Sequence, residues 1–204
     1  MPDEFIMTDR ALENKGGILL RIARDSIAQA LGVTHSTNKT LTQSNPWLQK
    51  KGACFITLTQ SGQLRGCIGT LQAHRTLFDD VQANAKAAAF NDTRFQPLSV
   101  GEFNETQVEV SLLSTTQNMH FSSEQEALAQ LQPDIDGIVF EYGSYRSTFL
   151  PQVWQQLPDS QQFMAHLKQK AGLPVNFWAD EVKLSRYTVT KWKESDFAAE
   201  TSQA

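Results

Sequence analysis

One run of seven residues constrains the fold more than any other part of the chain: Leu64-Arg65-Gly66-Cys67-Ile68-Gly69-Thr70. It places an arginine, a thiol and two glycines in one short, otherwise apolar segment. A regular strand alternates apolar and polar side chains and avoids glycine, because glycine weakens strands. The two glycines that flank the cysteine therefore indicate that another strand, or a ligand, approaches the backbone closely there.

The residues on both sides of this run predict a β-hairpin. Residues 53–59 are rich in strand-forming side chains, and a turn at 60–63 leads back into 64–70 as the second strand. A tight turn would pair Ile56 with Cys67 and place Cys54 diagonally from Cys67 on the same sheet face. Diagonal neighbours lie about 7–8 Å apart, beyond the usual span of a disulfide. We therefore expect two reduced thiols, as in a reducing compartment.

Periodicity and capping residues predict the other elements. One helix is expected at 18–31, and a second follows the capping residue Thr76 and runs to about residue 90. A third starts at Ser122 or Ser123 and ends at 131, and a fourth is capped by Asp159 or Ser160 and ends at 171. A loop is expected at 34–46, and strands at 105–115, 137–142, 145–150 and 182–193. The order hairpin, helix, strand occurs at 53–115 and again at 137–192. We therefore predict an α+β fold, a largely antiparallel sheet with flanking helices built from two hairpin–helix–strand units. It would be a single domain over 1–204, with a core of about 15–193 and a disordered tail at 194–204.

Composition argues against several classes of function. The 204 residues are 40% hydrophobic, but no apolar run approaches the roughly 20 residues that a membrane helix needs. The polar start, 1–10, lacks the features of a signal peptide, so we expect a cytoplasmic protein. A net charge of −4 argues against non-specific binding to nucleic acid. With four histidines, and neither an HExxH motif nor a CxxC pair, the sequence predicts no metal site and no cofactor.

The seven-residue run resembles the LRGCIG block of the AMMECR domain family. Further blocks that resemble the family pattern follow in family order, over roughly residues 15–192: 92–98, 108–113, 150–153 and 170–174, with Trp178 behind them. The resemblance implies an α+β fold with a larger and a smaller lobe. In bacteria, such proteins resemble protein A of the AmmeMemoRadiSam group, which is named with a Memo-like and a radical-SAM protein. The resemblance therefore implies these two proteins as partners, and it names no reaction.

The residues of the run have two interpretations each. Cys67 is a nucleophile, redox centre or metal ligand, or else a small apolar residue packed in the sheet. Arg65 grips a carboxylate or phosphate and lowers the pKa of the thiol, or it forms an ion pair across the hairpin or with Glu109. Gly66 and Gly69 turn backbone N–H groups toward an anion, or permit a bulge or a close helix. Thr70 ends the run and belongs to the same predicted binding surface.

Three residues from the next block extend this surface. The resemblance implies that Asp92, Arg94 and Phe95 lie beside the 64–70 strand. Asp92 would be an acid or base and Arg94 an anion binder; alternatively, Asp92 binds backbone amides in a turn and pairs with Arg94. Glu109, in a strand between valines, would be a catalytic base with a raised pKa or the partner of Arg65.

Two functions of different class fit these residues. The first is a binding or adaptor module that presents a cleft around 64–70 to Memo-like and radical-SAM proteins. The second is an enzyme for a small anionic substrate, with Arg65 and Arg94 binding and Cys67, Glu109 or Asp92 reacting. We favour the first, because the sequence does not assemble a nucleophile, a base and an orienting group. The chain would act as a monomer or a homodimer, and a third possibility is that the run serves folding alone.

Overall fold

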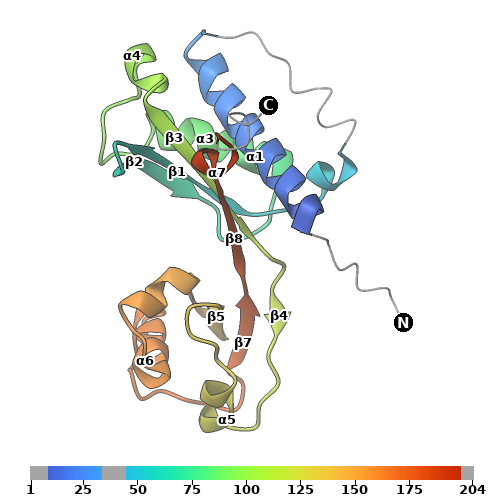
Figure 1. Ribbon diagram of the computed structural model, residues 1–204. Coiled ribbons are helices and arrows are strands. Elements are labelled where there is room, and N and C mark those ends of the chain that lie inside the picture. Colours follow the sequence, from blue (N-terminus) through green and yellow to red (C-terminus); the bar gives the residue numbers. More distant parts are fainter. Residues whose placement is uncertain (1–8, 34–44, 199–204) are drawn as a thin grey trace. The chain divides into compact units, whose positions relative to one another are not determined.

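The computed structural model describes residues 9–33 and 45–198, and these form an α+β fold (Figure 1). The chain divides into two compact units: unit 1 contains Met1–Leu112 and Thr190–Ala204, and unit 2 contains Leu113–Val189. Each unit holds one four-stranded sheet. The predicted α+β fold with antiparallel sheets is confirmed, whereas the idea that the two units repeat one hairpin–helix–strand design stays a prediction.

Unit 1 is a sheet covered by helices. Its strands are ordered β2-β1-β3-β8. Helix α3 packs against β1 and β2, and α1 packs against α3 (Figure 1). Fully buried side chains from both helices and from β1, such as Ile22, Val81 and Ile56, form the core between these layers. The elements are α1 (Asp9–Ala30), η1 (Pro46–Gln49), β1 (Cys54–Gln60), β2 (Gln63–Gly69), α3 (Leu77–Phe90), α4 (Val100–Phe103), β3 (Thr106–Leu113), β8 (Val189–Lys193) and α7 (Glu194–Ala198).

Local signals set the ends of the unit 1 helices. The Thr76 hydroxyl accepts the Asp79 N–H and caps α3, as predicted. Gly32 follows α1 with a φ of +72°, a conformation that glycine adopts without strain. Helix α1 starts at Asp9 rather than at residue 18, because its polar first turns lack the apolar periodicity on which the prediction depended.

The hairpin β1–β2 forms, but its register differs from the prediction. Ile56 pairs with Ile68, and Cys67 pairs with Thr57. Between Leu58, which pairs with Gly66, and Thr59, which pairs with Leu64, the register shifts, so Arg65 is an extra residue in a β-bulge. A one-residue shift moves side chains to the other sheet face. Cys54 and Cys67 therefore lie on opposite faces, not on one, and both are free thiols.

Unit 2 has the sheet order β4-β7-β5-β6. The hairpin predicted around Gly143 is present, and Gly143 has a φ of +55°. Helix α6 covers the sheet, and the Trp154 and Phe163 rings stack in the core with centroids 3.7 Å apart. The elements are β4 (Gln117–Asn118), α5 (Glu124–Ala129), β5 (Gly137–Tyr142), β6 (Tyr145–Phe149), η2 (Pro151–Gln155), α6 (Ser160–Lys170) and β7 (Lys183–Tyr187).

The end of the chain differs from the prediction in two respects. The single strand expected at 182–193 is two strands in different sheets, separated at Thr188, whose N–H and C=O both bond Ser114. Residues 194–198, expected in a disordered tail, form α7. The Glu194 carboxylate fixes this helix, because it binds the Arg24 guanidinium through both oxygens and accepts the Val108 N–H. Residues 199–204 lie outside the described residues.

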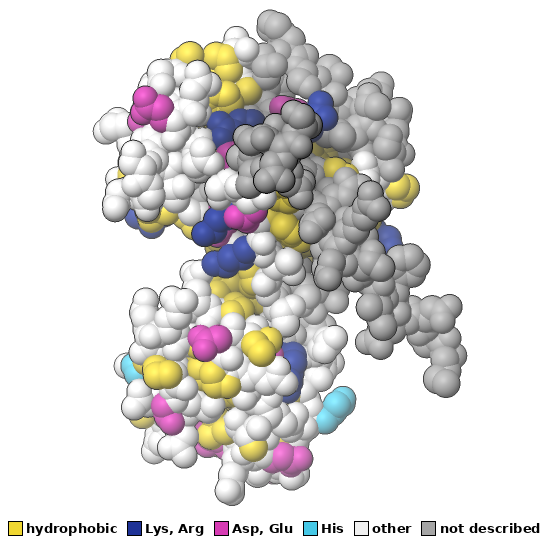
Figure 2. Space-filling model, in the orientation of Figure 1, with side chains coloured by type: hydrophobic (Ala, Val, Ile, Leu, Met, Phe, Trp, Pro, Cys, Tyr) yellow, Lys and Arg dark blue, Asp and Glu magenta, His cyan; other side chains and the backbone are white. Residues whose placement is uncertain are grey.

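Charged side chains are interspersed on the visible surface. Figure 2 shows lysine and arginine side chains in small groups, several of them beside acidic side chains. Arg65 forms an ion pair with Glu102, and Arg94 forms one with Asp92. In the part of the chain that the structure describes, no helix has the length and apolar character to cross a membrane.

Candidate functional site

The block at 92–95 lies against the outer edge of β2, as the sequence resemblance implied. Strand β2 is outermost in its sheet, and at Cys67 the backbone N–H and C=O point away from β1 toward this block. The N–H donates to Asp92 Oδ2 at 2.9 Å, and the C=O accepts from Arg94 Nη2 at 3.3 Å. Arg94 also donates to both Asp92 oxygens, at 2.9 and 2.6 Å. This ion pair thus occupies the backbone groups that a neighbouring strand would otherwise bind.

The surroundings of Asp92 keep its carboxyl ionised. Hydrogen bonds from Arg94, and then from the Cys67 N–H, hold the pKa of Asp92 well below its usual value. The Asp92 carboxylate is buried, whereas the Arg94 side chain is 54% exposed. The Asp92 C=O also accepts the Phe95 N–H at 3.0 Å. Asp92 therefore organises a turn and an ion pair, and a carboxylate with so low a pKa is a weak general base.

Arg65 is the bulged residue of β2, and its side chain forms an ion pair with Glu102. Its Nε lies 3.0 Å from Glu102 Oε1, and its Nη2 donates to the Gln96 C=O at 2.8 Å. The predicted pairing with Glu109 is wrong, because β1 lies between β2 and β3. The hydrogen bond from Arg65, with those from Ser99, lowers the pKa of Glu102 to about 2.

Phe95 connects the two arginines. Its ring centroid lies 5.9 Å from the Arg65 guanidinium carbon and 5.4 Å from that of Arg94. A ring face attracts a guanidinium at this range. Arg65 itself is largely buried, with 12% of its side chain exposed, and Phe95 is half-buried. The aromatic side chain therefore holds both cations in place beside Cys67.

The two glycines of β2 are explained by close packing. A Cβ on Gly66 would lie 2.2 Å from the Ala88 carbonyl oxygen of α3, and one on Gly69 would lie 2.2 Å from Phe55 Cγ. The close approach that the sequence indicated is thus an approach of the chain to itself. A role of these glycines in anion binding stays a prediction.

Cys67 and Glu109 lie in one row across three strands. Thr57 pairs with Cys67 on one side and with Glu109 on the other. The Cys67 Sγ lies 3.4 Å from Thr57 Oγ1, and the Glu109 oxygens lie 3.8 and 3.7 Å from the ammonium groups of Lys191 and Lys193. Among the described residues, no histidine hydrogen-bonds Cys67, and no three His, Cys, Asp or Glu side chains could hold a metal.

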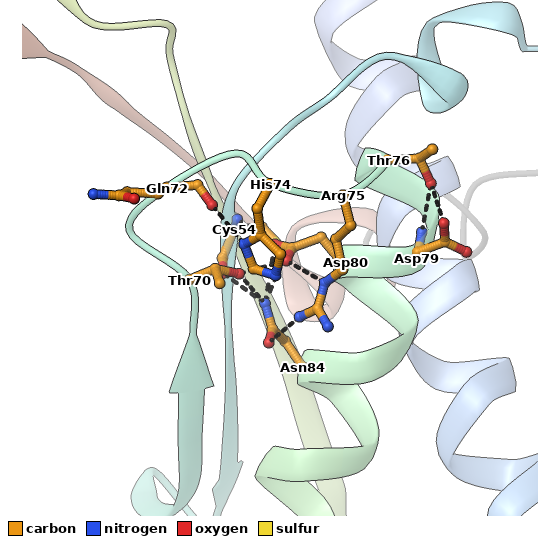
Figure 3. Close-up of polar contacts among 9 residues, drawn as sticks. All are labelled: Cys54, Thr70, Gln72, His74, Arg75, Thr76, Asp79, Asp80 and Asn84. Atoms are coloured by element: carbon orange, nitrogen blue, oxygen red, sulfur yellow. Dashed lines mark hydrogen bonds and ion pairs between the residues drawn. The ribbon is translucent and has the colours of Figure 1, made fainter.

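A second polar cluster joins the start of β1, the end of β2 and helix α3 (Figure 3). The fully buried Asp80 carboxylate accepts the Cys54 N–H at 2.8 Å, the Thr70 hydroxyl at 2.5 Å and Arg75 Nε at 2.8 Å. Asn84 donates to the Cys54 C=O at 3.0 Å and to Thr70 Oγ1 at 2.9 Å. The Thr70 hydroxyl, predicted to bind a ligand, is therefore already hydrogen-bonded within the chain.

Sequence reasoning missed the cluster, although a signal was present. Asp80 and Asn84 are four residues apart, on the face of α3 that also carries the buried Val81, Ala85 and Ala88. Polar side chains on an apolar helix face need internal partners. One effect is on Cys54, whose thiol pKa is raised well above its usual value by burial and by the Asp80 charge.

Comparisons with known proteins identify the family of this chain. Residues 20–192 match the model of the AMMECR1 family. The chain belongs to the AMMECR1 family. It is 37% identical over 194 residues to a protein of Sulfurisphaera tokodaii, covering 91% of this chain and 84% of that one. It is 34% identical over 185 residues to protein MJ0810 of Methanocaldococcus jannaschii, covering 88% and 90%.

A solved structure of similar fold is also known. The crystal structure of the uncharacterized protein PH0010 from Pyrococcus horikoshii has a TM-score of 0.71 and 28% sequence identity to this chain. The similarity covers 89% of this chain and 92% of that one. It extends over nearly the full length of both proteins, and therefore includes both units of this AMMECR1-family chain.

Proposed function

We propose that this chain is a protein-binding module that recognises its partner through the outer edge of β2. The β2-edge surface consists of Leu64, Arg65, Cys67, Arg94 and Phe95. The observation that carries the proposal is Arg94, whose exposed guanidinium is held by Asp92, by the Cys67 C=O and over Phe95. Arginine and aromatic side chains are enriched where proteins bind one another. An arginine fixed before binding loses less conformational entropy on association.

The charge balance of this surface favours a protein over a small anion. Arg65 is neutralised by Glu102 and Arg94 by Asp92, and both carboxyl pKa values are lowered by these contacts. A small anionic ligand would have to compete with these internal carboxylates. A protein surface instead contributes apolar contact as well, for example with Leu64, which is 43% exposed. Memo-like and radical-SAM proteins, which the family resemblance implies, are the partners we propose.

One observation favours the enzyme as a second candidate. Because Cys67, Thr57 and Glu109 are in register, and neighbouring strands lie about 4.8 Å apart, a small substrate lying over Thr57 could contact both the thiol and the carboxylate. In that case Cys67→Ser and Glu109→Gln should each abolish turnover of such a substrate. Turnover that survives both substitutions would contradict the assignment of these residues.

The binding proposal is tested with purified proteins. The chain, a Memo-like protein and a radical-SAM protein from one organism are mixed pairwise, and affinities are measured by calorimetry. We expect association with at least one of them, weakened about tenfold or more by Phe95→Ala and by Leu64→Ser. The matched control is Val175→Ser in unit 2, since Val175 is 51% exposed and lies outside the β2-edge surface. Absence of association, or equal weakening by all three variants, would contradict the proposal.

A further inference from the structure

In unit 2, the neighbour of β7 ends before β7 does. Strand β4 has only two residues, which pair with Ser185 and Arg186 of β7 (Figure 1). One further hydrogen bond follows, from the Met119 N–H to the Leu184 C=O at 2.9 Å. Beyond it lies a cavity of about 370 Å³, whose lining includes residues 118–121 and 182–185. The first residues of β7 therefore border an open space instead of a neighbouring strand.

Two backbone groups of this segment have no partner. In an antiparallel ladder, the N–H and C=O of one residue point to the same neighbouring strand, and this direction repeats every second residue. Because the Leu184 C=O accepts from Met119, the Leu184 N–H and the Val182 C=O also point to the β4 side. Within the described residues, nothing hydrogen-bonds either group. Both residues are buried, and buried backbone groups are nearly always paired.

One residue of an extended peptide can bond both groups. If it lies beside Lys183 in a parallel strand, its N–H donates to the Val182 C=O and its C=O accepts the Leu184 N–H. An antiparallel neighbour would instead need both groups of Leu184, and the Leu184 C=O is already occupied. Addition of a peptide strand to an open sheet edge is a recurring mode of recognition, in which main-chain hydrogen bonds supply the affinity.

The side chain of the added residue would extend a row of alternating charges. Arg146 of β6 is in register with Glu141 of β5, and Glu141 is in register with Lys183 of β7. The Glu141 carboxylate is held by Arg146 at 2.8 Å. The exposed Lys183 forms no ion pair with any described residue, Asp180 of the cavity lining included. Opposite charges directly across a strand pair are stabilising, so the fourth position of the row favours Asp or Glu.

We propose that this β7 edge, residues 182–184, binds an extended segment of a partner protein, parallel to β7 and with an acidic residue beside Lys183. The main chain of the segment is recognised by the Val182 C=O and the Leu184 N–H, and its carboxylate by the Lys183 ammonium. The site lies in unit 2, so it is distinct from the β2-edge surface and does not depend on the binding proposed there.

The test uses the whole, isotope-labelled chain and three peptides blocked at both ends. The first is acetyl-Thr-Val-Glu-Val-Thr-amide, the second has lysine in place of glutamate, and the third carries an N-methyl group on the glutamate nitrogen. We expect the first to shift the amide resonance of Leu184 in NMR spectra and to saturate. The other two should bind at least about fivefold more weakly, since each loses one contact. Equal affinities, or an unmoved Leu184 resonance at about 10 mM of the first peptide, would overturn the proposal.

Variants of Lys183 test the side-chain contact. Lys183→Gln should bring the affinities of the glutamate and lysine peptides together, and Lys183→Glu should reverse their order. The matched control is Lys86→Glu, because Lys86 is an equally exposed lysine of α3 in unit 1. This control should keep the preference of the wild type. If Lys86→Glu reverses the order as well, or if Lys183→Glu leaves it unchanged, the acidic residue is not read by Lys183 and the proposal is wrong.

Discussion

Gly66 leaves no space for a side chain, so Gly66→Ala measures how much stability depends on the contact between β2 and α3. A Cβ at this position would lie 2.2 Å from the Ala88 carbonyl oxygen, whereas ordinary van der Waals contact begins at 3.4 Å. The obstacle is helix backbone and not the end of a flexible side chain. Strand and helix must therefore move apart for the methyl group to fit.

The expected cost follows from what α3 buries. Forcing extra methyl groups into a packed core costs about 1–3 kcal/mol. Displacing α3 also disturbs the buried Val81, Ala85 and Ala88. We therefore expect the free energy of unfolding to fall by about 3 kcal/mol, at the upper end of this range. Gly101 in α4 provides the matched control, because nothing lies within 4 Å of its Cβ position and its φ is not positive. Gly101→Ala should be neutral or stabilise by up to about 1 kcal/mol.

Urea unfolding decides between these expectations. Far-UV circular dichroism and tryptophan fluorescence are followed for wild type and both variants, and midpoints are compared at constant slope. The midpoint of Gly66→Ala should fall well below those of the wild type and Gly101→Ala. Coincident midpoints for the two variants would refute the packing argument, and with it the explanation given for the first glycine of the LRGCIG block.

Three further results are expected. Folding lowers the pKa of the Asp92 carboxyl from its ordinary value of 3.8. The ionised carboxylate therefore stabilises the fold fully at pH values above 3.8, and this stabilisation is lost as the pH falls below 3.8 toward the lowered pKa. In urea titrations between about pH 7 and 2, stability should therefore fall more steeply for wild type than for Asp92→Asn; parallel curves would argue against the ion pair. Glu194→Gln should cost about 1–3 kcal/mol, since it removes the charge partner of Arg24, and an unchanged urea midpoint would show that the Arg24–Glu194 ion pair adds nothing to stability. Iodoacetamide should alkylate the half-buried Cys67 before Cys54, which is fully buried with a raised thiol pKa; equal rates in mass spectrometry would contradict this order.

Local signals allowed most element boundaries to be predicted. Thr76 before α3, Gly32 after α1 and the Gly143 turn between β5 and β6 each act within a few residues of themselves. A side chain that caps a helix, or a glycine with positive φ, requires no information about distant parts of the chain. These features were therefore visible in the sequence.

What could not be predicted depends on strand neighbours. The bulge at Arg65 adds one residue to β2 without changing the pattern of residue types, so the faces of Cys54 and Cys67 were assigned wrongly. Likewise, residues 182–193 keep a strand pattern while the chain passes from one sheet to the other at Thr188. The predicted ion pair between Arg65 and Glu109 is wrong for the same reason. Only the strand order shows that β1 separates the strand of Arg65 from the strand of Glu109.

The Asp92–Arg94 pair also affects how the protein behaves at high concentration. An open strand edge is a template on which a second chain can add its own strand and begin an aggregate. Along β2 the backbone groups of Cys67 are occupied by this pair, and the bulge at Arg65 interrupts the edge. At the opposite edge, β8 carries Lys191 and Lys193, and charged side chains on an edge strand discourage pairing with the edge of a second molecule. The same contacts that hold Arg94 in place thus leave an incoming strand without the Cys67 backbone groups to which it would bind.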